Sequence, residues 1–374
     1  MKLNKLRNLL LLFIVLIVAQ FSKAGIIEKP FGVFEGKQVM EYTLTNKGGM
    51  QLSIINYGGA ITRILTKDKD GNFGDVVTGF TNLEGYLQSG NPYFGALIGR
   101  YGNRIAKGTY TIDGIAYQAA LNNNGQSLHG GLKGFDKVFW EVQKLSGDSS
   151  LLLTYKSVDG EEGYPGNVLL KVIYSLSRNN EVGIDYTATT DKKTILNLTN
   201  HTYFNLSAGK VATIKDHKLQ IKANTYLPVD EVLIPLGKAL SVKGTAMDFT
   251  KLKAVGKELD QVQGGYDHNW IIDGWEKETM LKTNNLPVVA ILMDPLSGRK
   301  MTVSTTEPGI QFYSGNFLDG TLNLTKNGIQ YSKHAALTLE TQHFPDSPHQ
   351  PGYPSTELKP GETYHQKTVY QFSN

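Results

Sequence analysis

Hydrophobic and polar side chains alternate with a period of two along much of this chain. One segment shows the pattern over nine residues, with apolar side chains at Val168, Leu170, Val172, Tyr174 and Leu176. This is the period of a β-strand, whose successive side chains point to opposite faces of a sheet. Val182 to Thr190 repeats the pattern after the turn Arg178-Asn179-Asn180. The two segments are therefore predicted to form a hairpin.

Other segments give the same picture. Tyr364 to Phe372 is rich in aromatic and β-branched residues and follows the turn Pro360-Gly361, which predicts a further strand. The best helix candidate is short, Leu83 to Leu87 after Asn82. We therefore predict an all-β chain, a large antiparallel β-sandwich formed as a single domain by residues 25–374. Because about 350 residues is long for one domain, two closely fused sandwich halves are the alternative.

The N-terminal segment has the layout of a secretory signal peptide. Met1 to Arg7 is basic, Leu9 to Ala19 is an unbroken apolar run, and Ser22 and Ala24 are small residues that precede Gly25. The apolar run is much shorter than the ~20 residues that span a bilayer. We therefore expect cleavage after residue 24, export to a periplasmic or extracellular compartment, and no membrane attachment after cleavage.

Composition excludes several kinds of function. The chain of 374 residues has no cysteine, which excludes disulfides, thiol catalysis and thiolate metal sites. The formal net charge is +4, but Lys2, Lys5, Arg7 and Lys23 lie in the signal segment. Without these four bases, 34 Lys and Arg residues balance 34 Asp and Glu residues. A nucleic-acid partner is therefore not expected.

A few polar side chains stand in segments unlike ordinary strands. His129 lies in a glycine-flanked loop, His201 lies among Asn and Thr residues, and Asp267 and Glu340 also have polar neighbours. An imidazole and a carboxylate that meet in a pocket provide acid and base catalysis near neutral pH. Taken singly, each of these residues is more often structural than catalytic. The sequence has no His-Glu-x-x-His motif, no glycine-rich nucleotide motif and no Gly-x-Ser-x-Gly motif.

Six motifs in one order carry a family resemblance. They are Gly99-Arg100-Tyr101-Gly102-Asn103-Arg104-Ile105-Ala106, Ser127-Leu128-His129-Gly130-Gly131, Asn200-His201-Thr202-Tyr203-Phe204-Asn205-Leu206, Gly265-Tyr266-Asp267-His268-Asn269, Gly309-Ile310-Gln311-Phe312-Tyr313-Ser314-Gly315-Asn316 and Leu339-Glu340-Thr341-Gln342. Each motif alone is weak, but together they closely resemble the aldose 1-epimerase (galactose mutarotase) family. The resemblance extends from about Phe31 to Phe372.

The resemblance implies a galactose mutarotase-like supersandwich with an open sugar-binding cleft. It also implies interconversion of the α and β anomers of free hexoses such as glucose and galactose, without a metal or an organic cofactor. By this resemblance His201 is the general acid and Glu340 the general base. The implied substrate-binding residues are Asn103, Arg104, His129, Asp267 and Gln311. A small monosaccharide is the expected partner, and we expect a monomer, with a dimer as the alternative.

This chemistry suits the residue types. With ordinary pKa values of about 4.3 and about 6.5, Glu340 is expected to be ionised and His201 able to carry a proton. The base removes the proton of the anomeric hydroxyl while the acid protonates the ring oxygen, and the two exchange roles when the ring closes. Trp140 is either part of an aromatic wall for the sugar or a core residue. His268 is expected to be structural, on the strand face opposite Asp267.

Three alternatives remain at this level. A glycosidase could use Asp267 and Glu340 as paired carboxylates. A carbohydrate-binding module would need an aromatic wall but no acid–base pair. A phosphorylated hexose is a third alternative, against which export argues because phosphosugars are mainly intracellular metabolites.

Overall fold

The computed structural model describes residues 24–147, 149–276 and 286–374. The predicted signal segment, residues 1–24, lies outside these ranges except for Ala24. Within them, no helix is long and apolar enough to cross a bilayer. The structure consists mainly of antiparallel sheets, and the α-helix seen in the described ranges is the predicted one, α1 (Leu83–Leu87), whose first turn is capped by the Asn82 side chain.

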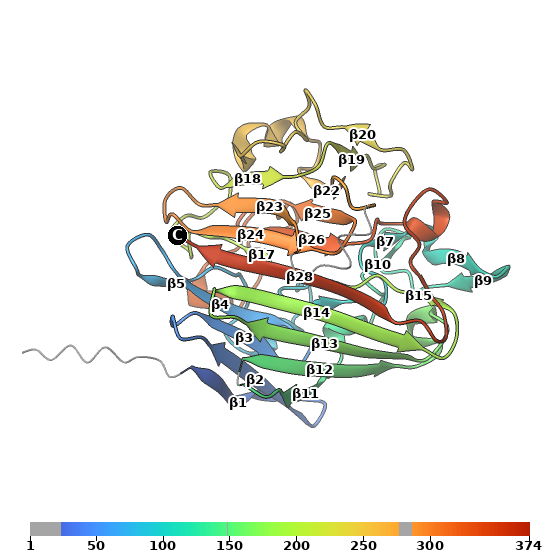
Figure 1. Ribbon diagram of the computed structural model, residues 1–374, viewed down its shortest axis with the longest axis horizontal. Coiled ribbons are helices and arrows are strands. Elements are labelled where there is room, and N and C mark those ends of the chain that lie inside the picture. Colours follow the sequence, from blue (N-terminus) through green and yellow to red (C-terminus); the bar gives the residue numbers. More distant parts are fainter. Residues whose placement is uncertain (1–23, 148, 277–285) are drawn as a thin grey trace, which may run out of the picture.

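A nine-stranded sheet forms the largest layer, and Figure 1 shows its central strands from green β12 to orange β23. Its strands, in spatial order, are β11 (Glu141–Lys144), β12 (Ser150–Ser157), β13 (Val168–Leu176), β14 (Glu181–Thr190), β28 (Tyr364–Ser373), β24 (Lys300–Thr305), β23 (Val288–Met293), β18 (Lys218–Ile221) and β21 (Lys253–Ala254). The predicted hairpin is confirmed as β13 and β14, with Val168 opposite Thr190. The predicted C-terminal strand is confirmed as β28.

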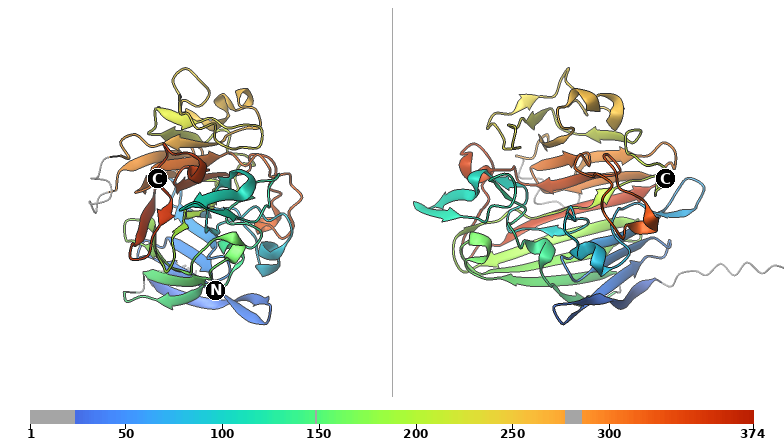
Figure 2. Two further views of the ribbon diagram at one scale, coloured as in Figure 1. Left: turned by 90° about the vertical axis from the view of Figure 1, so that its right-hand side faces the viewer. Right: turned by 180° about the vertical axis from the view of Figure 1, so that it is seen from behind.

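Two further sheets cover one face of the large sheet. The five-stranded sheet contains β1 (Gly25–Phe34), β2 (Lys37–Thr45), β3 (Gln51–Ile55), β4 (Ile61–Lys67) and β5 (Phe73–Asp75). The six-stranded sheet contains, in spatial order, β17 (Tyr203–Phe204), β26 (Leu337–Gln342), β25 (Gly309–Tyr313), β22 (Asp267–Ile271), β19 (Thr225–Leu227) and β20 (Leu240–Ser241). Figure 2 (left) shows these layers along the strand direction.

Short elements complete the chain between the sheets. Two-stranded pairs are formed by β6 (Leu97–Ile98) with β16 (Thr199–Asn200), β7 (Arg104–Ile105) with β10 (Ser127–Leu128), β8 (Thr109–Ile112) with β9 (Ile115–Gln118), and β15 (Thr194–Ile195) with β27 (Glu357–Leu358). Single 3-10 turns are η1 (Ala106–Gly108), η2 (Phe135–Lys137), η3 (Glu161–Gly163), η4 (Val255–Lys257), η5 (Leu259–Gln261), η6 (Lys326–Gly328) and η7 (Ser347–His349).

The core lies between these layers and follows from the period-two pattern. The apolar set of β13 is buried, whereas Leu169 on the opposite face is 41% exposed. Tyr174 of β13 donates its hydroxyl to the Gly59 carbonyl at 2.9 Å, next to β4. Tyr370 of β28 donates to the Leu339 carbonyl of β26 at 3.2 Å. The predicted all-β sandwich is therefore confirmed, with each smaller sheet joined to the large one.

Candidate active site

Three adjacent strands of the six-stranded sheet present polar side chains on one face. Gln311 of β25 lies opposite Glu340 of β26 and opposite Asn269 of β22. Asp267 is two residues before Asn269 and therefore points to the same face. The register of this sheet thus brings together Asp267, Gln311 and Glu340, which are far apart in the sequence.

Turns supply the remaining predicted residues. His201 lies between β16 and β17, and its carbonyl accepts a hydrogen bond from the Gly95 amide at 3.0 Å. Asn103 precedes β7 and His129 follows β10, both with positive φ values, 64° and 53°. Because β7 pairs with β10, Arg104 lies opposite Leu128. The turn that carries Asn103 and the turn that carries His129 therefore lie side by side.

These elements surround a cleft of about 270 Å³ that is open to solvent. Its lining residues are Pro92, Tyr93, Asn103, Arg104, Asn123, Leu128, His129, His201, Tyr203, Asp267, Tyr313, Phe317 and Glu340. Six of the seven residues predicted from the resemblance line it, and the seventh, Gln311, does not. The expected open cleft is thus present, large enough for a small ligand.

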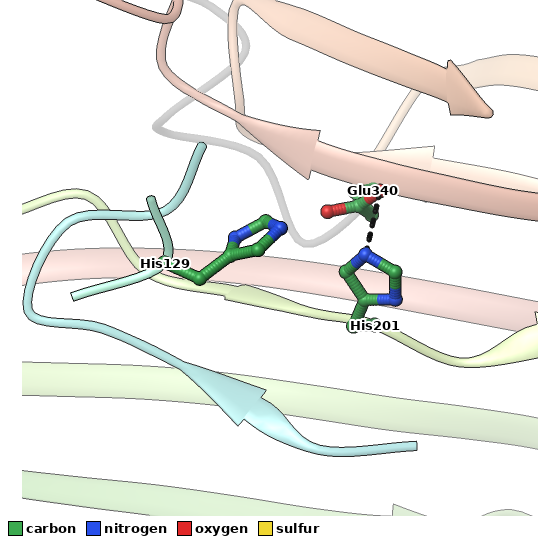
Figure 3. A group of neighbouring side chains, drawn as sticks. All are labelled: His129, His201 and Glu340. Carbon is green, nitrogen blue, oxygen red and sulfur yellow. Dashed lines mark ion pairs between the residues drawn. The ribbon is translucent and has the colours of Figure 1, made fainter. Parts of the chain in front are cut away.

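His201 and Glu340 face each other inside this cleft, as Figure 3 shows. The His201 Nε2 atom is 3.6 Å from Glu340 Oε1, and both side chains are almost fully buried. The Thr338 hydroxyl donates to the same Oε1 at 2.8 Å. Glu340 Oε2 and His201 Nδ1 have no hydrogen-bond partner. Oε2 is therefore the carboxyl oxygen of Glu340 that is left unpaired within the described structure.

The protonation states differ from those expected from the sequence. Burial raises the pKa of Glu340 to about 8, an effect that Thr338 opposes and that Asp267 increases. Burial lowers the pKa of His201 to about 3, and the effect of its own backbone carbonyl is smaller. A buried site disfavours the charged form of either group. At neutral pH the single proton of the pair therefore lies on Glu340, and the expectation of an ionised Glu340 beside a protonated His201 is wrong for the ligand-free protein.

His129 is held as a hydrogen-bond donor. Its Nδ1 accepts a hydrogen bond from the Asn103 backbone amide at 3.2 Å. Burial lowers the pKa of His129 well below its usual value, so the ring is neutral and its proton lies on Nε2. Ligand atoms of His129, His201 and Glu340 lie within 4.8 Å of one another, the spacing of a metal site. In this tautomer, however, Nε2 offers no lone pair, so the donor set does not fit a metal ion.

Gln311 acts on the cleft through Asp267. Its Nε2 donates to Asp267 Oδ1 at 2.8 Å, while the Arg104 guanidinium lies 4.0 Å from Oδ2. Arg104 is also fixed through its backbone amide, which donates to Asn103 Oδ1 at 2.9 Å. These contacts leave the Asp267 carboxylate oriented to accept hydrogen bonds from a polyhydroxylated ligand.

The aromatic wall comes from residues that the sequence reasoning did not select. Trp140 is a core residue, 2% exposed, and its ring packs against Phe135 and Tyr155. The aromatic residues of the cleft are instead Tyr93, Tyr203, Tyr313 and Phe317. Tyr203 and Tyr313 lie within the quoted motifs, but only the strand pairing shows which of the motif residues face the cleft.

His268 lies away from the cleft, as expected. Its ring packs near Tyr226, with a centroid distance of 6.0 Å, and near Trp270. Trp270 lies on the face of β22 opposite Asp267, and Tyr226 lies beside it on the neighbouring strand β19.

Comparisons with known proteins agree over nearly the whole chain. A family model described as Aldose 1-epimerase matches residues 40–371. Galactose mutarotase from Bos taurus is 47% identical over 325 residues, which cover 87% of this chain and 91% of that protein. Aldose 1-epimerase from Escherichia coli strain K12 is 37% identical over 352 residues, which cover 92% and 98% of the two chains. The crystal structure of galactose 1-epimerase from Lactobacillus acidophilus matches with a TM-score of 0.80 at 28% identity, covering 94% of this chain and 99% of that chain.

Proposed function

Because this chain belongs to the aldose 1-epimerase family, we propose that it interconverts the α and β anomers of free hexoses, with glucose and galactose as substrates. The enzyme is a carbohydrate isomerase, and a small sugar is its ligand. The observation that carries the mechanism is the buried pair of His201 and Glu340, 3.6 Å apart in the cleft.

The reaction needs two proton transfers at one hemiacetal. The anomeric hydroxyl of the sugar donates to Glu340 Oε2, the unpaired carboxyl oxygen, and this hydrogen bond favours the carboxylate form. The proton of the pair then moves to His201 Nε2. Glu340 takes the anomeric proton while His201 protonates the ring oxygen, and the ring C–O bond breaks. Rotation about the neighbouring C–C bond and the reverse transfers give the other anomer.

The protonation of the free enzyme matches the ring-opened stage of this sequence. After ring opening Glu340 is protonated and His201 is neutral, which is the state that burial favours. Ring opening therefore returns the pair to the protonation state that burial favours. The other hydroxyls of the sugar form hydrogen bonds with Asp267, Arg104, Asn103 and His129.

Polarimetry tests the proposal directly. The purified protein should accelerate the change in optical rotation of freshly dissolved α-galactose and α-glucose. His201→Asn and Glu340→Gln should each lower kcat by at least about 10²-fold, because each removes one proton transfer. Two exposed residues provide matched controls, His365→Asn and Glu357→Gln, and both should keep wild-type rates. An unchanged rotation with the wild-type protein would exclude the proposed activity.

The glycosidase and the carbohydrate-binding module, the two alternatives considered above, make different predictions. A glycosidase would release nitrophenol from a nitrophenyl glycoside. A binding module would bind sugar without changing the rate of rotation, and Glu340→Gln would lower affinity alone. Family membership and the acid–base pair support the isomerase over both.

We propose in addition that the enzyme is exported. The first strand, β1, starts at Gly25, directly after the predicted cleavage site. Mass spectrometry of the protein from its native host should give a mature N-terminus at Gly25, recovered with the extracytoplasmic fraction. A cytoplasmic protein that retains residues 1–24 would contradict this proposal.

A further inference from the structure

The His201 ring is oriented by aromatic packing. Its Nδ1 has no hydrogen-bond partner, whereas a catalytic imidazole is commonly oriented by a hydrogen bond at that atom. Three rings surround it instead. The centroid distances are 5.1 Å to Tyr203, 5.0 Å to His129 and 5.7 Å to Tyr93. The direction of Nε2 therefore depends on these neighbours.

Tyr93 contacts both imidazoles of the cleft. Its ring centroid is 4.7 Å from that of His129, in an edge-to-face arrangement. The Lys137 ammonium also lies over the Tyr93 ring, 5.5 Å from its centroid, and forms an ion pair with Asp136 at 3.1 Å. The Tyr93 ring thus packs against a tethered cation and two histidines.

The backbone at Tyr93 is strained. Its φ value is 63°, in the left-handed region that bulky residues rarely occupy. Such conformations persist where the surrounding structure imposes them, and they concentrate at functional sites. The chain therefore keeps an aromatic side chain at a position where glycine or asparagine would fit the backbone better.

We propose that Tyr93 is a positioning residue for the reaction, whose ring sets the orientation of His201 and excludes water from it. This inference rests on the function proposed above. A sugar contact alone would make Tyr93 important for KM, whereas a positioning role makes it important for kcat, because a misplaced acid fails after the sugar has bound.

Three substitutions separate these roles. Tyr93→Phe keeps the ring and should keep kcat. Tyr93→Leu removes the ring and should lower kcat about tenfold to a hundredfold, with a smaller change in KM. Tyr93→Asn also removes the ring, and asparagine adopts the left-handed backbone conformation more readily than leucine. The same kcat and KM measurements can therefore be made on this variant if Tyr93→Leu does not fold. Tyr117→Leu, at a tyrosine of β9 that stacks on Tyr110 outside the cleft lining, is the matched control.

NMR of the imidazole signals gives a second readout that a purely structural role would not change. The groups that face His201 are Glu340 and His129, with Tyr93 and Tyr203 against its ring. In the wild-type protein the His201 signal, assigned with His201→Asn, should not shift between about pH 5 and pH 7, below the range in which Glu340 ionises. In Tyr93→Leu or Tyr93→Asn, water reaches the ring, and its pKa should rise toward the ordinary value of about 6.5.

Wild-type kcat and an unchanged His201 signal in both ring-deleted variants would overturn this inference while leaving the proposed function intact. A rise in KM with kcat preserved would also overturn it and would assign Tyr93 to sugar contact. Absence of mutarotation in the wild-type protein would instead overturn the proposed function.

Discussion

Burial moves the pKa values of Glu340 and His201 in opposite directions, to about 8 and about 3. Between these values the pair holds one proton, which lies on Glu340 in the ligand-free protein. The sugar can then move the proton from Glu340 to His201 without any exchange with solvent. A single buried threonine, Thr338, sets which carboxylate oxygen stays free.

The shifted pKa values predict the pH dependence of catalysis. We expect kcat/KM to remain level between about pH 5 and pH 7 and to fall above about pH 8, where Glu340 loses the proton of the pair. Polarimetry across this range, corrected for the uncatalysed rate in each buffer, measures the profile. A decline that begins near pH 6.5 would indicate instead an exposed imidazole with an ordinary pKa.

Thr338 provides a second prediction for the same profile. Thr338→Val removes a hydrogen bond that favours the carboxylate, so the pKa of Glu340 should rise further and the alkaline limb should move to higher pH. Thr338→Ser should restore the wild-type profile. The matched control is Thr341→Val on the same strand, because the Thr341 hydroxyl bonds to Thr368 and not to Glu340. Equal profiles for both valine variants would contradict the role of Thr338.

Among the elements, the turn after β10 determines where His129 lies. His129, Gly130 and Gly131 all have positive φ values, so the chain reverses sharply within three residues. A Cβ atom at Gly130 would overlap the carbonyl oxygen of Gly99, which is part of the backbone leading into β7. The two short strands and their turns can approach this closely only because residue 130 has no side chain.

Gly130→Ala should therefore lower the free energy of unfolding by more than about 2 kcal/mol and raise KM, since His129 and Asn103 are displaced together. Gly125→Ala is the control, because Gly125 has a similar φ value of 77° but no atom near its added Cβ. Its cost should be about 1 kcal/mol, from backbone conformation alone. Urea unfolding of the two variants measures the difference, and equal losses would show that the contact with Gly99 is unimportant.

In the whole molecule, the large sheet packs against the six-stranded sheet. The strand register of the six-stranded sheet aligns Asp267, Gln311 and Glu340 on its face away from the large sheet. The turns that line the cleft cover Glu340 on the face of β26 away from the core, leaving it 2% exposed, and this burial is what perturbs its pKa. A carboxyl group whose pKa is higher in the folded protein than in the unfolded chain contributes stability at low pH. That contribution is lost as the pH rises through the folded pKa.

Glu340→Gln should therefore be inactive but more stable than the wild-type protein under alkaline conditions. The amide stays neutral, whereas Glu340 keeps its proton up to about pH 8 in the folded protein and loses it near pH 4.5 in the unfolded chain, so wild-type stability falls between these values. The stability difference between variant and wild type should grow by about 3 kcal/mol from pH 6 to pH 9. Thermal or urea unfolding at the two pH values measures it, with exposed Glu357→Gln as control. A difference that is the same at both values would mean that Glu340 is already ionised at pH 6.

Local patterns in the sequence were sufficient for the elements. The period-two segments predicted β13 and β14, and the aromatic and β-branched run after Pro360-Gly361 predicted β28. Asn82 with the residues after it predicted α1, because strand faces, turns and caps depend on near neighbours. The ordered motifs also identified six residues of the cleft lining. Which residues carry the chemistry was visible in the sequence only through the family resemblance, since a single His or Glu has no distinctive local pattern.

Tertiary structure decided how those residues behave. The protonation of Glu340 and His201 depends on burial beneath the turns that line the cleft. The placement of Gln311 behind Asp267 depends on strand register, and the position of Trp140 in the core depends on packing. Each of these properties arises from contacts between segments far apart in the chain. Sequence periodicity reports which face of a strand is apolar, but it carries no information on which distant segment covers that face.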